Sequence, residues 1–178
     1  MQEVILELLR FIQAPLLSPT MIWTIAPLIV VTLAMTYYFG KYPSEQLGWN
    51  TVLGNSIVLL FVSLDLLRTI HSYTTPASFE NVLLNPVKVG LIFLLLLEGI
   101  LLAYAAFKHA KLQKIVYFFA SAQSINTQAY LLTVIVYLQL QPTLHTVLAA
   151  FIFFMTTLIT LRILQEIEHF SFGNHGKK

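Results

Sequence analysis

Glu98 is an acidic residue in an otherwise apolar part of the chain. The run 91–102 contains only apolar side chains apart from Glu98 and Gly99. If this run belongs to a membrane-spanning helix, the carboxyl group lies roughly 16 Å from the outer end, near the middle of the bilayer. Ionisable side chains are costly at that depth and usually have a function, so Glu98 is the first candidate site. Gly99, Ala103 and Ala106 form a small-residue face beside it, which predicts that Glu98 faces another helix rather than lipid.

Polar side chains cluster again in the next apolar segment, at Ser121, Gln123, Ser124, Asn126, Thr127 and Gln128. Because this segment runs in the opposite direction, we expect Gln123 to lie at about the depth of Glu98. The cluster covers too much of a helix for one partner, so it faces several helices, lines a wet cavity or marks a broken helix. Two interpretations stay open: hydrogen bonds between helices, or binding of a cation, a proton or a small polar solute. The candidate ion-binding or solute-binding residues are Glu98, Gln123, Ser124, Asn126 and Gln128.

Asp65 and Arg68 are two charged residues of opposite sign within another apolar segment. Their i,i+3 spacing places them on one face of a helix, about 10 Å or less from its outer end. The sequence therefore predicts an intramembrane ion pair in which the Arg68 side chain extends toward the membrane surface. The alternative is a charged site at the outer mouth of a pathway.

Motifs of known catalytic, metal or cofactor sites are missing from the sequence. It has no nucleophile elbow, phosphate-binding loop or dinucleotide-binding glycine pattern. With a single aspartate and no cysteine, it cannot form an aspartate-rich magnesium site or a thiolate metal site. Glu166, Glu168 and His169 are of metal-ligand type, but the two glutamates point to different faces of a helix. We expect no catalytic residues, no metal and no cofactor, and we favour a protein that is not an enzyme.

The composition indicates a membrane protein. Of the 178 residues, 57% are hydrophobic and 10% are charged, whereas soluble domains carry about 25% charged residues. The net charge of +2 and the scattered basic residues give no reason to expect nucleic-acid binding. We predict an all-α, polytopic membrane helix bundle. Its five expected transmembrane helices are Pro19–Gly40, Thr51–His71, Pro86–Phe107, Leu112–Gln139 and Pro142–Leu164.

The two ends of the chain flank this bundle. In residues 1–17 the apolar face of a helix is formed by Val4, Ile5, Leu8, Leu9 and Ile12. This pattern predicts an N-terminal amphipathic interfacial helix, lying at the bilayer surface or against a neighbouring subunit. Residues 18–170 form the five-span bundle, and residues 171–178 form a short polar tail. We expect one domain with these flanking segments.

The distribution of lysine and arginine predicts the orientation of the chain. With the N-terminus outside and the C-terminus in the cytoplasm, seven basic residues lie on the cytoplasmic side and three lie outside. The cytoplasmic set is Lys41, Lys108, Lys111, Lys114, Arg162, Lys177 and Lys178. Such an excess is typical of cytoplasmic loops. We expect the protein in a plasma or other cell membrane.

Three classes of function are compatible with these residues. The one we favour is a small structural or accessory subunit of a larger membrane assembly, because nearly all of the chain is used for membrane helices. The alternative is an oligomeric channel or transporter component that uses Glu98 and the polar cluster for a proton, a cation or a small polar solute. An intramembrane enzyme with an unfamiliar site is the third. The expected partners are the lipid bilayer and either other membrane subunits or further copies of the chain.

Overall fold

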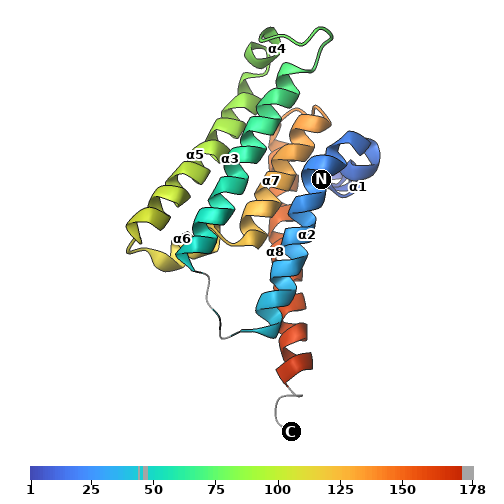
Figure 1. Ribbon diagram of the computed structural model, residues 1–178. Coiled ribbons are helices and arrows are strands. Elements are labelled where there is room, and N and C mark those ends of the chain that lie inside the picture. Colours follow the sequence, from blue (N-terminus) through green and yellow to red (C-terminus); the bar gives the residue numbers. More distant parts are fainter. Residues whose placement is uncertain (44, 46–47, 174–178) are drawn as a thin grey trace.

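The computed structural model describes residues 1–43, 45 and 48–173, and every regular element in them is helical (Figure 1). The elements in chain order are α1 (Gln2–Leu17), the 3-10 turn η1 (Pro19–Met21), α2 (Ile22–Lys41), α3 (Trp49–His71), α4 (Glu80–Leu83), α5 (Pro86–Lys108), α6 (Gln113–Phe119), α7 (Ala122–Tyr137) and α8 (Leu144–Gly173). The first three residues of the expected C-terminal tail, 171–173, therefore belong to α8. The rest of that tail, 174–178, lies outside the described residues.

Four of the helical segments are long and apolar enough to cross a membrane. They are Pro19–Lys41, Trp49–His71, Pro86–Lys108 and Leu144–Phe170. A 23-residue helix is about 34 Å long, which exceeds the roughly 30 Å of a hydrocarbon core. These four segments correspond to the first, second, third and fifth expected spans. Four such helices fit a multi-pass protein embedded in a membrane.

The fourth expected span, 112–139, is not one helix. It is divided between α6 and α7, and the backbone of Ser121 is extended at the break (φ −64°, ψ 144°). The Ser121 side chain caps α7 by accepting a hydrogen bond from the Ser124 backbone N–H. On the other side of the break, the Asn55 amide donates to the Ala120 carbonyl oxygen over 2.8 Å. Side chains therefore satisfy backbone groups that an uninterrupted helix would have paired internally.

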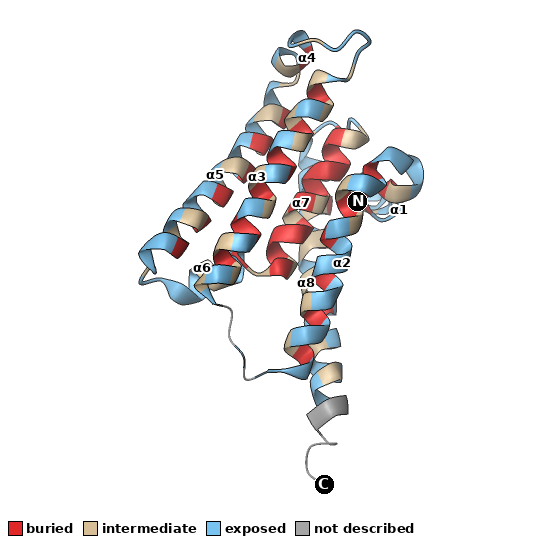
Figure 2. Cartoon of the chain, viewed as in Figure 1, coloured by how far each residue is buried: buried red, intermediate tan, exposed pale blue. Residues whose placement is uncertain are grey.

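Helix α7 is the centre of the bundle. Twelve of its 16 residues are buried, and it contacts α2, α3, α5 and α8 (Figure 2). Around it, α3 packs along α5, and α2 packs along α8. The outer faces of these four long helices are mostly apolar and exposed. This arrangement surrounds a short and largely buried helix with long apolar ones.

Two glycines lie at close contacts between helices. A Cβ atom on Gly99 of α5 would lie 3.0 Å from Leu60 Cδ2 and 3.1 Å from the Ser56 carbonyl oxygen of α3. A Cβ atom on Gly40 of α2 would lie 2.7 Å from Glu168 Cβ of α8. Because neither space admits a side chain, both pairs of helices approach more closely than bulkier residues would permit. The small-residue face expected around Gly99 thus contacts α3.

Helix α1 lies against α8 and buries only part of the expected apolar face (Figure 1). Phe11 and Ala14 are fully buried, and Tyr130 of α7 donates a hydrogen bond to the Phe11 carbonyl oxygen over 2.7 Å. Of the residues expected on the apolar face, Val4 and Leu8 pack against this cluster, whereas the remaining three, Ile5, Leu9 and Ile12, are exposed. The helix therefore has one apolar side that contacts the bundle and another that is left uncovered.

Candidate functional site

Glu98 and Gln128 meet between α5 and α7. The Gln128 side-chain nitrogen Nε2 lies 3.2 Å from Glu98 Oε1 and 3.1 Å from Ser124 Oγ, and it donates to both oxygens. Glu98 is half-buried and lies near the middle of α5. Its second oxygen, Oε2, has no hydrogen-bond partner among the described residues. One oxygen is therefore fixed by α7, and the other is available to a group outside the chain.

The other two amides of the polar cluster point to a different helix. Asn126 donates to Thr32 Oγ1 over 3.0 Å, and Gln123 donates to Thr36 Oγ1 over 3.3 Å. Both threonines lie on α2 and use their own hydroxyl protons for carbonyl oxygens one turn earlier. They are therefore available as acceptors for the two amides, and Asn126 and Gln123 bind α7 to α2.

The five candidate residues consequently form two groups rather than one site. Glu98, Ser124 and Gln128 are joined between α5 and α7, whereas Gln123 and Asn126 face α2. Of the amides expected near Glu98, Gln128 donates to it. Gln123, which counting along one unbroken helix places at the depth of Glu98, instead donates to α2. Of the three explanations for so broad a polar cluster, contact with several helices and a broken helix both apply.

Asp65 binds hydroxyl groups of two other helices. Thr24 of α2 donates to Asp65 Oδ2 over 2.9 Å, and Tyr137 of α7 donates to the same oxygen over 3.3 Å. Among the described residues, Arg68 and Asp65 do not form an ion pair with each other, so the intramembrane pair expected from the sequence is absent from the structure. The physical reason is that the two hydroxyls reach the short carboxyl group from facing helices, while the Arg68 side chain is exposed. Thr24 and Tyr137 were missed because nothing in their spacing along the chain links them to Asp65.

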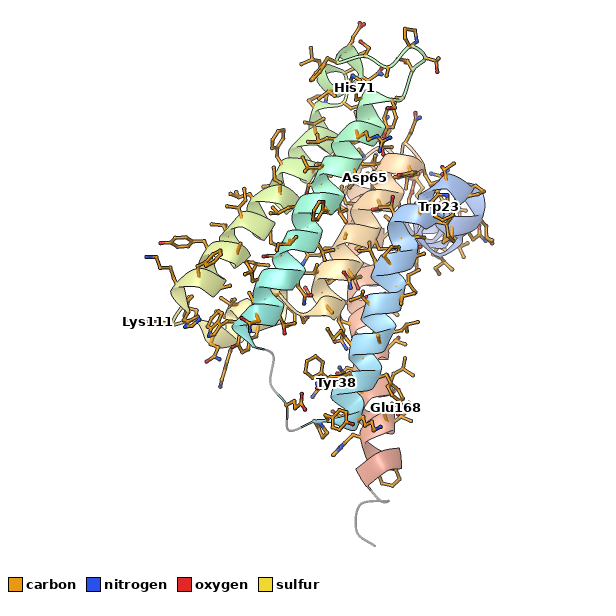
Figure 3. The ribbon with its side chains drawn as sticks, in the orientation of Figure 1. Trp23, Tyr38, Asp65, His71, Lys111 and Glu168 are labelled. Atoms are coloured by element: carbon orange, nitrogen blue, oxygen red, sulfur yellow. The ribbon has the colours of Figure 1, made fainter. Side chains whose placement is uncertain are left out.

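Asp65 and Arg68 do line a common cavity of about 510 Å³, which Thr24 and Tyr137 also line. Trp23 and Asp65 both lie in the half of the molecule that contains α1 and α4 (Figure 3). The alternative interpretation of this pair, a charged site at the mouth of a pathway, is therefore compatible with the geometry. A cavity of this size is in the range of small-molecule sites.

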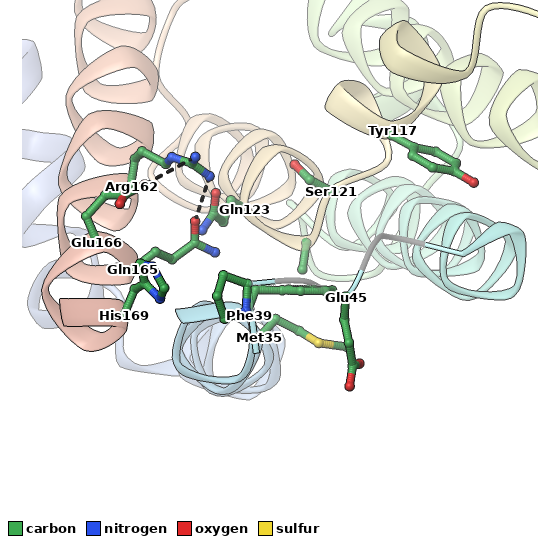
Figure 4. A pocket seen from close by; sticks show the side chains of 12 residues that line it. Met35, Phe39, Glu45, Tyr117, Ser121, Gln123, Arg162, Gln165, Glu166 and His169 are labelled. Atoms are coloured by element: carbon green, nitrogen blue, oxygen red, sulfur yellow. Dashed lines mark hydrogen bonds and ion pairs between the residues drawn. The ribbon is translucent and has the colours of Figure 1, made fainter. Parts of the chain in front are cut away.

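A second polar cavity, of about 460 Å³, lies where α2 and α8 end and α7 begins (Figure 4). Ser121, Gln123, Arg162, Glu166 and His169 are among its lining residues. Arg162 forms an ion pair with Glu166 over 3.2 Å. In the part of the chain that the structure describes, no three histidine or acidic side chains are grouped closely enough to hold a metal ion.

Comparisons with protein-family models, with curated proteins and with solved structures find no match for this chain. The function must therefore be inferred from the geometry of its own residues.

Proposed function

We propose that this chain is a non-enzymatic, multi-pass membrane protein that serves as a structural or accessory subunit of a larger membrane assembly. The observation that supports this function is the free carboxyl oxygen of Glu98. A polar atom that lies in hydrocarbon without a hydrogen-bond partner destabilises the protein by at least about 1–3 kcal/mol. A neighbouring membrane protein that presents a donor beside α5 and α7 removes this cost.

The proposed topology has five crossings. Four are the long apolar helices, and α7 is the fifth, enclosed by the others rather than facing lipid. We place the N-terminus outside and the C-terminus in the cytoplasm, as the distribution of basic residues predicts. Helix α1 then lies at the outer interface, where its uncovered apolar side, which includes Ile5, Leu9 and Ile12, contacts lipid or the partner.

Co-purification of the full-length chain from its native membrane tests the proposal. In mild detergent, the wild-type protein is expected to retain a second protein in fixed stoichiometry, measured by native mass spectrometry. Glu98→Leu removes both carboxyl oxygens and is expected to release the partner, whereas Glu98→Gln keeps an acceptor and a similar shape and is expected to retain part of it. Glu80→Gln, an exposed change on α4, is the matched control and should leave the complex intact.

Two results would contradict this function. The first is a wild-type chain that is extracted alone or only with copies of itself. The second is a Glu98→Leu variant that folds, as judged by its melting temperature, and binds the same amount of partner as the wild type.

A specific observation also favours the second function, a channel or transporter component. Ser121 lines the cavity at the start of α7, and its hydroxyl accepts a hydrogen bond from the backbone N–H of Ser124. The Gln128 amide in turn donates to both the Ser124 hydroxyl and Glu98. Polar groups thus extend from this cavity to the middle of α5. If a proton or cation follows this route, liposomes with the purified wild-type chain should show flux that Glu98→Gln abolishes. Absence of wild-type flux would exclude this function and leave the first one standing.

A further inference from the structure

The cavity beside Asp65 and Arg68 combines a carboxylate and a guanidinium that do not neutralise each other. Oδ2 of Asp65 accepts two hydroxyl protons, and Oδ1 has no hydrogen-bond partner among the described residues. Two donors on one oxygen fix the orientation of the carboxyl group. The remaining oxygen is therefore a preorganised acceptor at the cavity wall.

Arg68 supplies the opposite charge one helical turn further along α3. Its guanidinium has neither an ion pair nor a hydrogen bond within the described chain, and its side chain is exposed. A guanidinium presents a rigid set of donors that matches a carboxylate or a phosphate group. Since residues at i and i+3 have Cβ atoms about 5–6 Å apart, one small ligand can contact both side chains.

The aromatic residues of the cavity do not form a cage for a quaternary ammonium group. Trp23 is 84% exposed, and the ring of Tyr73 has the Lys88 ammonium 5.4 Å from its centroid. Quaternary ammonium groups are bound by several aromatic faces and cannot donate hydrogen bonds. The acceptor offered by Asp65 instead selects a cation with N–H groups.

We propose that this cavity binds a zwitterionic ligand that carries a primary ammonium group near a phosphate or carboxylate. Asp65 accepts hydrogen bonds from the ammonium, and Arg68 binds the anionic group. This chemistry is shared by the headgroup of phosphatidylethanolamine and by free amino acids. The inference does not depend on the function of Glu98, which lies at another site.

Fluorescence of Trp23 gives a direct test, because this side chain lines the cavity and the protein has only two tryptophans. In the Trp49→Phe variant of the full-length protein, Trp23 emission is titrated with phosphoethanolamine, glycine, ethanolamine and inorganic phosphate. At least one of the two zwitterions is expected to bind at least tenfold more tightly than either single-charge compound. Asp65→Asn and Arg68→Gln should each weaken that binding about tenfold or more, and Lys111→Gln, an exposed change away from the cavity, should not alter it.

Lipid nanodiscs distinguish the two sources of the ligand. A higher melting temperature in phosphatidylethanolamine than in phosphatidylcholine, lost in Asp65→Asn, assigns the cavity to a lipid headgroup. Equal melting temperatures in the two lipids, together with binding of soluble zwitterions, assign it to a free solute. The proposal is overturned if neither zwitterion exceeds ethanolamine and phosphate, or if folded Asp65→Asn and Arg68→Gln variants both respond as the wild type does.

Discussion

From the contact between α3 and α5 we predict how much stability the substitution Gly99→Ala removes. The added Cβ would lie 3.0 Å from Leu60 Cδ2, 3.1 Å from Leu59 Cβ and 3.1 Å from the Ser56 carbonyl oxygen. Carbon atoms in favourable contact are about 3.5–4.0 Å apart, so the two helices must separate by several tenths of an ångström. The same substitution at Gly90 of α5 is a matched control, because a Cβ there meets nothing within 4 Å.

The difference between the two variants isolates the cost of the helix contact. Alanine gains up to about 1 kcal/mol over glycine within a helix, and this gain is common to both positions. Overpacking of a close contact costs about 1–3 kcal/mol and applies only to Gly99→Ala. We therefore expect Gly99→Ala to be about 1–3 kcal/mol less stable than Gly90→Ala.

Trp49 reports this difference. Its ring stacks on His109 at a centroid distance of 5.3 Å, and these residues lie at the start of α3 and just after α5. In a Trp23→Phe background, Trp49 is the only tryptophan, so its emission follows separation of the helix pair during unfolding in mixed detergent micelles. If Gly99→Ala unfolds at the same or a higher denaturant concentration than Gly90→Ala, α3 and α5 do not approach as closely as the structure shows.

Two more substitutions test other parts of the fold. Asn55→Ala leaves the Ala120 carbonyl oxygen at the α6–α7 break without its donor and should lower the free energy of unfolding by about 1–3 kcal/mol in the same assay; an unchanged value would show that the break does not need Asn55. Tyr73 lies beyond the end of α3, donates a hydrogen bond to the Val136 carbonyl oxygen, and has its pKa raised by burial to about 12. The folded state favours the neutral phenol of Tyr73. The contribution of Tyr73 to the stability of the fold is therefore complete below pH 10 and is lost as the pH rises toward 12. The melting-temperature advantage of the wild type over Tyr73→Phe should narrow in that pH range, and a constant difference would contradict this assignment.

The long apolar helices could be predicted from the sequence, whereas the break between α6 and α7 was only one of three explanations for the polar cluster. Length and hydropathy determine whether a segment can cross a membrane, and four segments meet that condition in both sequence and structure. Residues 112–139 are also apolar on average, which concealed the break. Ser121 is a good helix cap, but serine also occurs within helices. One contact at the break is the hydrogen bond from Asn55, a residue 65 positions away in the sequence.

The partner of Glu98 was expected only as one of several amides. Counting along one continuous helix places Gln123 at about the depth of the carboxyl group. In the structure the donor to Glu98 is Gln128, and the helix that carries both amides begins at Ala122. The acid and an amide of the next segment were predictable from their types, whereas the exact pair depends on where a helix starts.

The partners of Asp65 depend on tertiary structure in a similar way. Spacing within one helix suggested Arg68, which is the nearest opposite charge along the chain. The hydroxyl groups that bind Asp65 come from Thr24 and Tyr137, on two different helices. Local spacing therefore identified the carboxyl group but not the side chains that contact it.

The short length of α7 and the polar side chains in its first half have a consequence for biogenesis. Its 16 residues span about 24 Å and include Gln123, Asn126 and Gln128, so the segment is a poor substrate for independent insertion by the translocon. Thr32 and Thr36 of α2 and Glu98 of α5 are synthesised earlier and already offer acceptors when α7 emerges. We expect α7 to enter the bilayer only by docking onto these preceding helices, so that membrane integration of this segment and its folding are a single event.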